Sequence, residues 1–577
     1  MINKMNPFQF EAATSLPHDQ LIEFFIEDNN FSRFVKSNRN IFLIGERGSG
    51  KTMNLLYHSI EIQKISALRN NYDIDLTYVG VYIPCSTPLY QKNEYQLSTN
   101  DYQSVVISEN LFVLDMAYYL IKSIDTVKES IIIDGIDNIL SEIAYVLDIN
   151  IPDKIDVCNS LMQYFKKESS SFQRKIMEDF NIKTATLWSF YSLIIPLLSI
   201  LRKIDALKNT HFMLMVDDIQ YLNEYQRKLL NSLISYRDNS LFSFKVATPK
   251  TNQDDMTTLS GGTILEGHDY LEINMVQPFQ NRTAAFSNFA KEIIERRIKK
   301  ISDKNLTADE FFPQHQQFEK DINEANEKVK QEAILRNPDW SKKQIADYIY
   351  KYGRAQYFRD RAVKSNIPPY SGFEIIKHLS TGVIRNLLDP CYWMYDRVLS
   401  NIHDGQQPIE SIPPNIQAEV IHARSEKLWK FLNDGLECKV HGCTEKQSNA
   451  IKNLFEKLSL LFKYRLLHHK SEPRAIVFTI SGMNRESESI ILPLLEIAQK
   501  ANLLYERMSR AKDDGFLEPY YTPNRMLWPS IGLDPQGQYS RVSLKAKDII
   551  AATKGYDFPI NDSDSINYSI QGDLFDE

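Results

Sequence analysis

Residues 40–52, NIFLIGERGSGKT, decide the fold of this chain. The first six of them, NIFLIG, form a short apolar run that is typical of a buried parallel strand. The glycine-rich loop GERGSGKT follows at residues 45–52, and the helical pattern MNLLYHSIEIQKI comes next. Strand, loop and helix in this order are the context in which the pattern G-x-x-x-x-G-K-[ST] predicts a phosphate-binding loop.

The loop chemistry suits ATP and Mg²⁺. Its glycines let the backbone fold tightly so that N–H groups point at phosphates, and the next helix adds its dipole. Lys51 is predicted to reach the β- and γ-phosphates, and Thr52 to ligate Mg²⁺ through its hydroxyl. The predicted cofactor-binding residues are Gly45, Glu46, Arg47, Gly48, Ser49, Gly50, Lys51 and Thr52. An ordinary glycine-rich turn is the alternative, which the rarity of a chance match disfavours.

A second predicted strand ends in two carboxylates. Residues 211–220 read HFMLMVDDIQ, and the unbroken apolar run within them predicts a central strand. Its carboxyl end is where ligands bind in a parallel sheet. Asp217 is therefore predicted to hold the Mg²⁺ shell, and Asp218 to orient or deprotonate the attacking water. The alternative is a turn followed by a helix N-cap, which the upstream loop makes less attractive.

Three more apolar runs extend the predicted sheet, at residues 76–84, 241–247 and 267–275. An amphipathic segment between residues 221 and 240 predicts a helix. Thr248 ends the run 241–247, and its hydroxyl can contact the γ-phosphate or the water. The long interval between residues 84 and 212 carries apolar residues at helical spacing, which predicts a helical insertion for contact with a partner.

Composition indicates a helix-rich globular protein. Of 577 residues, 43% are hydrophobic and 24% charged, which excludes wholesale disorder. Glycine is 20 of 577, about half of the usual ~7%. The net charge of −7 means that nucleic acid would need a local basic surface. Five scattered cysteines make no disulfide framework, and Cys438-x-x-His441-x-Cys443 lacks the second ligand pair of a zinc site, so ordinary thiols are favoured.

The sequence predicts a soluble, cytoplasmic protein without a membrane partner. The first residues, MINKMNPFQFEAATS, lack the apolar core of a signal peptide. The most apolar stretch, residues 187–201, is shorter than the ~18 residues of a spanning helix and contains Pro196. It is predicted to be a buried or interface helix.

The motifs GERGSGKT (Walker A) and MLMVDDIQ (Walker B), with the polar strand end at Thr248, resemble the AAA+ superfamily of P-loop ATPases. They look most like the initiator type, the origin-recognition-complex-like ATPases and their bacterial relatives. The resemblance covers roughly residues 35–400. Within it, STGVIRNL at residues 380–387 is similar to the family's second sensor, which implies that Arg385 contacts the nucleotide. A helix-surface arginine is the alternative. The implied catalytic residues are Lys51, Asp217, Asp218, Thr248 and Arg385.

Two departures from the AAA+ motors favour a nucleotide-gated switch. Asp218 stands where motors carry the longer glutamate, which affects how water is positioned and therefore turnover. Residues 249–270, where arginine fingers usually lie, contain no arginine. The resemblance implies an ATPase that couples nucleotide state to DNA or partner-protein binding, in a bacterial mobile-element or antiviral defence system. The alternative is a signalling scaffold that binds ATP with little turnover and recruits an effector protein; a homo-oligomer is compatible with both.

The chain is predicted to contain an α/β P-loop core, a helical lid and a C-terminal winged helix-turn-helix domain. The predicted parts are residues 1–278 (core, with the insertion at about 86–210), 279–404 (lid with the second sensor), 405–556 (winged helix) and 557–577 (disordered acidic tail). Residues 280–365 interleave Lys and Arg with aromatics, which suits nucleic acid, although a solvated helix face is favoured.

The predicted winged domain has helices at 416–432, 445–467 and 490–504, strands at 475–480 and near Leu527 and Val542, and a basic loop at 506–515. Its predicted contacts to duplex DNA are Arg507, Arg510, Lys512, Arg525, Arg541 and Lys545. A protein-contact module is the alternative.

The acidic tail carries one short motif. Gln571-Gly572-Asp573-Leu574-Phe575 resembles the bacterial sliding-clamp-binding motif, in which a glutamine and a leucine-phenylalanine pair dock on the clamp. A flexible tail can present two apolar anchors and an amide in this way. The alternative is a frayed end whose apolar pair docks on the protein's own surface.

Overall fold

The computed structural model forms two compact units. One comprises Glu11–Met275, and the other combines Met1–Phe10 with Val276–Glu577. The structure describes residues 6–9, 12–27, 31–85, 101–129, 136–150, 156–179, 186–236, 240–249, 256–276, 283–362, 368–401, 409–469, 472–510, 517–537 and 541–560. The acidic tail from residue 561 onward, with its clamp-like motif, lies outside them, so both expectations for it stay predictions.

A five-stranded parallel sheet forms the centre of the first unit, in the order β2-β3-β4-β1-β5. Its strands are β1 (Ile41–Ile44), β2 (Tyr78–Pro84), β3 (His211–Asp217), β4 (Phe242–Thr248) and β5 (Leu271–Asn274). Every residue of β1, β3 and β4 is buried, which explains the predominantly apolar runs in the sequence. The predicted α/β P-loop core is thereby confirmed.

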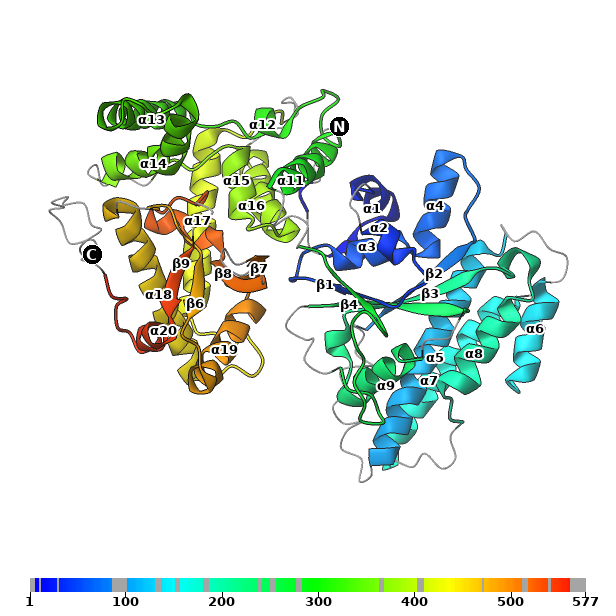
Figure 1. Ribbon diagram of the computed structural model, residues 1–577. Helices are drawn as coiled ribbons and strands as arrows, with labels where there is room; N and C mark the ends of the chain where they lie inside the picture. The colour runs from blue at the N-terminus through cyan, green and yellow to red at the C-terminus, as the bar shows by residue number, and fades with distance from the viewer. Residues whose placement is uncertain are drawn as a thin grey trace. The chain divides into compact units, whose positions relative to one another are not determined.

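Helices cover both faces of this sheet (Figure 1). One face carries the P-loop helix α3 (Lys51–Tyr57), with α1 (His18–Phe24) and α4 (Ile60–Asn70) packed beside it. The other face is covered by α5, α8 and α9, with α6 and α7 packed against α5 and α8. The bounds are α2 (Ser32–Val35), α5 (Asp101–Val127), α6 (Ile136–Val146), α7 (Val157–Asp179), α8 (Phe190–Leu201) and α9 (Glu224–Ile234). The predicted insertion therefore contributes directly to the core.

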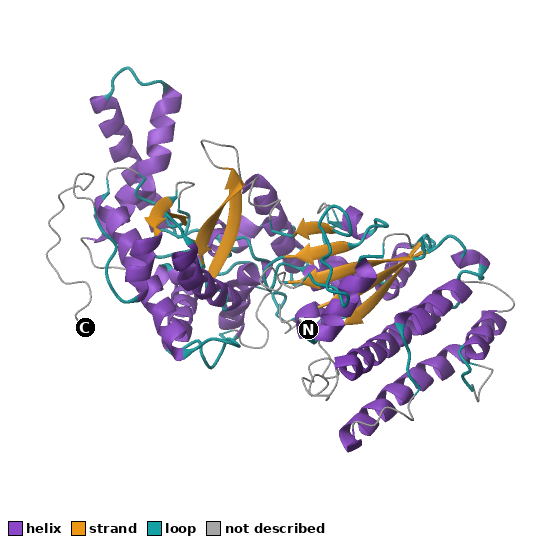
Figure 2. Cartoon of the chain, turned by 60° about the horizontal axis from the view of Figure 1, so that its bottom comes forward, coloured by secondary structure: helices purple, strands orange, loops and turns teal. Residues whose placement is uncertain are grey.

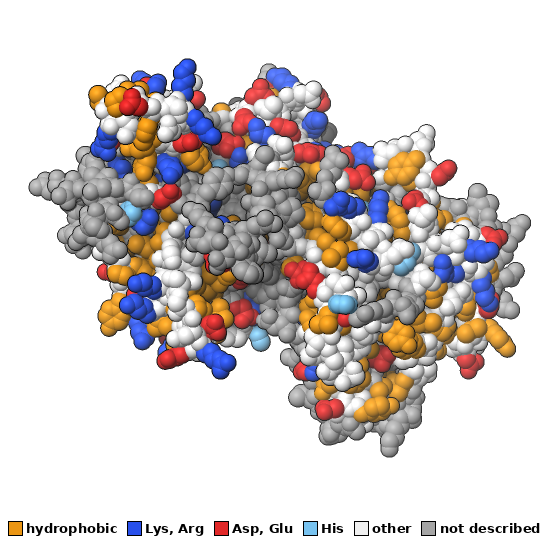
Figure 3. All heavy atoms as spheres, viewed as in Figure 1, with side chains coloured by type: hydrophobic (Ala, Val, Ile, Leu, Met, Phe, Trp, Pro, Cys, Tyr) orange, Lys and Arg blue, Asp and Glu red, His pale blue; other side chains and the backbone are white. Residues whose placement is uncertain are grey.

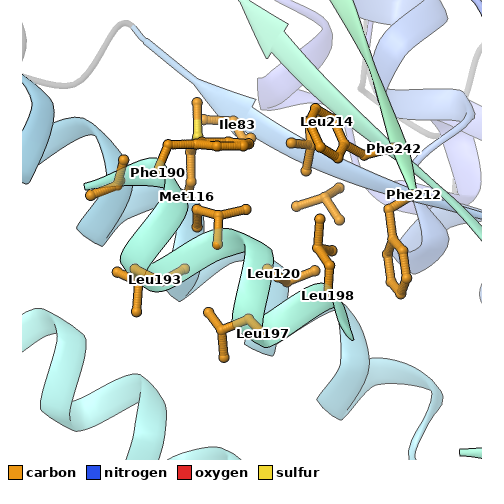
Figure 4. Close-up of a cluster of buried hydrophobic side chains, with 14 of the residues drawn as sticks. Ile83, Met116, Leu120, Phe190, Leu193, Leu197, Leu198, Phe212, Leu214 and Phe242 are labelled. Carbon is orange, nitrogen blue, oxygen red and sulfur yellow. The ribbon is translucent and has the colours of Figure 1, made fainter. Parts of the chain in front are cut away.

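The largest hydrophobic core lies between the sheet and helices α5 and α8. Figure 4 shows Met116 and Leu120 of α5 meeting Leu193 and Leu197 of α8 below Leu214 of β3. All five of these side chains are fully buried. The segment expected to be a buried or interface helix is thus the buried helix α8, which begins at a capping box and contains a proline.

Helix α5 is the one helix of the described chain that is long and apolar enough to cross a membrane. Most of its apolar window is buried, because the helix packs against β2, α7 and α8. The sequence pattern indicates residues 187–201, and not this helix, as the most apolar stretch. Its burial in the core is that of a central helix in a soluble protein; the cytoplasmic location stays a prediction.

The second unit is mainly helical and contains a separate four-stranded sheet, in the order β7-β8-β6-β9 (Figure 2). Its helices are α11 (Thr283–Ile298), α12 (Ala308–Phe311), α13 (Gln316–Arg336), α14 (Lys342–Ala362), α15 (Phe373–Leu379), α16 (Ile384–Leu399), α17 (Pro414–Asn433), α18 (Glu445–His468), α19 (Arg485–Lys500) and α20 (Ala546–Thr553). Its strands are β6 (Phe478–Ser481), β7 (Leu504–Arg510), β8 (Leu517–Pro523) and β9 (Val542–Lys545).

The C-terminal sheet contains an antiparallel hairpin, β7–β8, and β6 pairs with β8, as in the strand arrangement of a winged domain. The predicted helices at 416–432, 445–467 and 490–504 correspond to α17, α18 and α19, and the winged helix-turn-helix assignment stays a prediction. Two local predictions are wrong. Residues 506–510 are part of strand β7 rather than a loop, and Leu527 ends a 3₁₀ helix, which the Asn524 side chain caps, rather than lying in a strand.

A buried ion cluster joins the lid helices to the C-terminal sheet. Arg354 of α14 donates two hydrogen bonds to Asp534, at 2.8 and 3.0 Å, and Arg474 donates a third at 3.3 Å. Burial alone would raise the pKa of Asp534, but the two guanidinium groups hold it well below its usual range. The helices and the sheet consequently belong to one compact unit.

The N-terminal residues pack in the second unit. The Phe8 ring is fully buried and lies about 6 Å from the rings of Phe311, Phe312 and Tyr395. The Asn6 amide donates to the Tyr392 carbonyl at 2.9 Å. From residue 12 the chain belongs to the first unit, so it passes between the units twice.

Strand β4 carries a buried lysine beside the P-loop strand. Lys245 is fully buried, pairs in register with Ile41, and donates to the carbonyl oxygens of Ser37 and Arg39. Burial lowers the pKa of Lys245 from 10.5 to about 7. The charged form is therefore disfavoured in the folded protein.

Lys245→Met removes this titration and keeps the side-chain length. In the wild type the buried charge costs stability below about pH 7, and this cost falls as the pH rises towards the unfolded value. The wild type should therefore gain stability relative to the variant above about pH 7, by up to about 1.4 kcal/mol per pH unit. Calorimetric unfolding at matched ionic strength measures the difference, with the exposed Lys203→Met as control. A difference that does not change with pH contradicts the prediction.

Candidate nucleotide site

The P-loop connects β1 to α3 through two glycines in left-handed conformations. Gly48 and Gly50 have φ of 93° and 96°, angles that side-chain-bearing residues rarely adopt. Gly45 is needed for a different reason, because a Cβ there would lie 2.8 Å from the Ser49 hydroxyl oxygen. The sequence of glycines thus matches a tightly folded loop.

Lys51 and Ser49 lie inside this loop. Lys51 is 7% exposed, and its ammonium donates to the carbonyl oxygens of Gly45, at 2.8 Å, and Glu46, at 3.0 Å. The first N–H groups of α3 have no acceptor within the helix and favour an anion there. The Ser49 hydroxyl is buried with no hydrogen-bond partner in the described chain. The loop therefore fits a phosphate chain, while the Arg47 side chain is exposed.

The parallel register brings the acidic strand to this loop. Strand β4 lies between β1 and β3, pairing Ile44 with Thr248 and Val216 with Val246. The carboxyl ends of the three strands consequently lie side by side. Thr248 is buried at the end of β4, and its hydroxyl donates to the carbonyl of Pro249 at 3.3 Å. The structure thus brings together the P-loop, Asp217 and Thr248, as the strand order requires.

Asp217 is the buried carboxylate of the site, at 1% exposure. Its Oδ1 accepts the backbone N–H of Asp218 at 3.0 Å, and its Oδ2 accepts the Tyr82 hydroxyl at 2.8 Å. Thr52 lies near enough to this carboxylate to help lower its pKa. Burial, and then the charge of Asp218, raise the pKa of Asp217, and its hydrogen-bond donors and Lys51 oppose them. Thr52 and Asp217 supply oxygen ligands of the kind Mg²⁺ prefers.

Asp218 differs from Asp217 in backbone and surroundings. Its φ of 59° and ψ of 47° are left-handed, and its side chain is only partly buried. The carboxylate accepts the Gln220 amide N–H at 2.8 Å. Asp217 is thus buried among hydrogen-bond donors, whereas Asp218 is partly exposed. In this arrangement Asp217 can bind a metal ion while Asp218 positions a water molecule. The individual roles stay predictions.

Sequence reasoning missed two neighbours of Asp217. Tyr82 and Cys85 come from β2 and the residue just after it, and the Cys85 N–H donates to the carbonyl oxygen of Asp217 at 3.0 Å. Burial raises the pKa of the Cys85 thiol, so it behaves as a neutral packing group. The period-two alternation in residues 76–84 could have placed Tyr82 on one face, but not next to Asp217.

Arg385 and the proposed DNA contacts lie in the second unit. Arg385 is in the first turn of α16, which begins as predicted after the turn at Thr381 and Gly382; its sensor role stays a prediction. The Lys512 position and the Arg510 side chain lie outside the described structure. Arg507 and Arg525 are engaged within the second unit, and their phosphate contacts stay predictions.

Both of those arginines are held by the protein itself. Arg507 is 4% exposed, lies over the Tyr505 ring at 5.1 Å and donates to the Thr381 carbonyl at 3.3 Å. Arg525 hydrogen-bonds Nδ1 of His378 at 3.1 Å. Burial lowers the pKa of His378 to about 3, so the ring is neutral and can accept. Both arginines therefore serve packing between α15, α16 and the C-terminal sheet.

Two predicted cations have a more open setting. Lys545 is exposed at the end of β9, and Arg541 stacks over the Tyr520 ring at 4.2 Å.

As for metals, no group of three or more His, Cys, Asp or Glu side chains in the described ranges could hold an ion by itself. This includes Cys438, His441 and Cys443.

A model of the ORC-CDC6-like family matches residues 6–344 and 338–544 of the chain. The two matches together span both compact units, including the P-loop, the acidic strand and the C-terminal sheet. No curated protein sequence matches the chain.

Lys51→Ala should lower the affinity for ATP by about 10- to 100-fold, because the phosphates lose a charged hydrogen-bond donor. Titration with a fluorescent ATP analogue measures the change. Lys203→Ala, on the helical insertion, is the matched control and should bind like the wild type. Unchanged ATP binding by Lys51→Ala would show that the loop does not hold a nucleotide.

Proposed function

The chain belongs to the ORC-CDC6-like family, and we propose that it is a Mg²⁺-dependent AAA+ ATPase that acts as a slow nucleotide switch. One observation carries the proposal: the parallel register places the buried carboxylate of Asp217 at the same sheet edge as the P-loop, where Thr52 and Lys51 lower its pKa. This links the phosphate loop to the acidic strand in the manner that an NTPase site needs.

The side chains have separable roles in this proposal. The P-loop N–H groups and Lys51 bind the β- and γ-phosphates, and Thr52 with Asp217 would hold the magnesium ion. That ion would neutralise charge developing on the phosphates. Asp218 orients the attacking water from the partly exposed side of the strand end. Thr248 adds a polar group at the end of β4, between the P-loop strand and the acidic strand. Arg385 would couple the lid helices to the bound nucleotide.

Slow turnover is supported by Asp218. Its short carboxylate is already engaged by Gln220, and aspartate reaches less far than the glutamate of AAA+ motors. A switch that stays long in the ATP state could report nucleotide state to DNA or to an effector protein, and the bacterial defence or mobile-element setting is part of the same proposal. The second candidate, a scaffold with almost no turnover, is favoured by the same carboxylate.

Asp218→Asn keeps the tolerance for a left-handed backbone and removes the charge. We expect the rate of ATP hydrolysis to fall at least about 100-fold while Mg²⁺-ATP binding is retained, because only water activation is lost. Asp217→Ala should instead lose the Mg²⁺ dependence of hydrolysis. Phosphate release under single turnover measures both. A wild type that binds ATP but shows no faster release than Asp218→Asn would favour the scaffold.

DNA contact is proposed for the exposed face of the C-terminal sheet. Arg541 stacks over Tyr520, and Lys545 is exposed at the end of β9; cations and an aromatic ring suit nucleic-acid contact. Figure 3 shows basic side chains beside hydrophobic ones on the α13–α14 hairpin. Arg336 and Tyr350 are among the exposed side chains of this hairpin, which are a second group. An effector could equally use these faces.

Arg541→Glu with Lys545→Glu should weaken binding of duplex DNA by the full chain about tenfold at low salt. The slope of log affinity against log salt should fall by about two, because two phosphate contacts are lost. Fluorescence anisotropy across a salt series measures both quantities. Lys203→Glu with Lys228→Glu is a charge-matched control in the first unit. If both double variants bind alike, the C-terminal sheet is not the DNA surface.

A further inference from the structure

Tyr82 lies at the edge of the sheet next to the acidic strand. Strand β2 pairs in register with β3, so that Tyr82 is opposite Met215 and Pro84 is opposite Asp217. The alternation of the strand sends Val81 and Ile83 into the core below α5 and α8. Tyr82 therefore projects from the other face, the face of the P-loop helix, and its hydroxyl reaches Oδ2 of Asp217 at 2.8 Å.

The Asp217 carboxylate is held from two directions. The Asp218 N–H binds Oδ1, and Tyr82 binds Oδ2 from β2. With a donor on each oxygen, rotation of the carboxylate about its own axis breaks at least one hydrogen bond. The orientation of the group is thus set by β2 as well as by the backbone that follows β3.

The Tyr82 ring is not enclosed by protein on every side. It forms part of the wall of a pocket of about 260 Å³, together with Ser59, Glu61, Tyr119 and Lys122. Glu61 pairs with Lys122 at 3.3 Å at this pocket. Because there is space beside the ring, packing alone does not fix the position of the phenol. The hydrogen bond to Asp217 is therefore what holds its hydroxyl in place.

We propose that Tyr82 is a positioning residue for the magnesium ligand Asp217. It acts through Asp217 and touches neither nucleotide nor metal. The inference rests on the proposed function, since it says how that site keeps the carboxylate of Asp217 in the orientation of a metal ligand. Groups that orient a metal ligand typically change metal affinity or activity by about 10- to 100-fold when they are removed.

Tyr82→Phe removes the hydroxyl and keeps the ring. The Mg²⁺ concentration for half-maximal hydrolysis should rise about tenfold or more, and kcat should fall. The KM for ATP at saturating Mg²⁺ should stay close to the wild-type value, because the P-loop is untouched. Binding of a fluorescent ATP analogue in EDTA should also be unchanged.

Tyr78→Phe is the matched control. Tyr78 lies on the same strand and the same face, but its hydroxyl interacts with Lys36 instead of Asp217. It should leave the Mg²⁺ dependence unchanged. In the background of Asp217→Asn, Tyr82→Phe should have no further effect on the Mg²⁺ dependence, because both changes act on one ligand.

The outcomes separate the two proposals. A wild type that binds no ATP removes the proposed function and this inference with it. A wild type that binds and hydrolyses Mg²⁺-ATP, with Tyr82→Phe showing the same Mg²⁺ dependence, overturns the inference alone. A loss of ATP binding by Tyr82→Phe in EDTA also overturns it, because the hydroxyl would then support the fold of the site instead of its metal ligand.

Discussion

The in-register pairing of β1, β4 and β3 is the constraint on which the site depends. Because β4 aligns Ile44 with Thr248 and runs beside β3, the P-loop, Thr248 and Asp217 come to one edge of the sheet. A slip of one residue would reverse the faces of every side chain on the moved strand. The buried apolar faces of these strands therefore secure the geometry of the polar groups at their ends.

The chain is divided between two compact units, which are defined by how its segments pack and which the chain connects. Phe8 packs with the lid helices, whereas α1 packs against α3 and α4 a few residues later. The buried cluster around Asp534 makes the lid helices and the C-terminal sheet one body. The unit that carries the P-loop is therefore joined to the other unit at two points of the chain, near residues 11 and 275.

How far the sequence predicted the molecule depended on the range of the interactions. The central strands and α8 follow from local apolar patterns, and the P-loop from a motif with its context. Tyr82 was missed because its partner lies 135 positions away, in a neighbouring strand. Arg507 and Arg525 looked like surface cations, but tertiary packing uses them. Leu527 was expected in a strand, but it ends a 3₁₀ helix that the Asn524 side chain caps.

At position 218 the choice of aspartate and the backbone conformation depend on each other. Asp218 is left-handed at φ 59°, a conformation that aspartate and asparagine adopt far more readily than glutamate. A glutamate in its place would gain reach but strain the turn that leads into the next 3₁₀ helix, and would change the bond to Gln220. The departure from the motor sequence is thus matched to the local fold, because the left-handed turn favours the shorter aspartate.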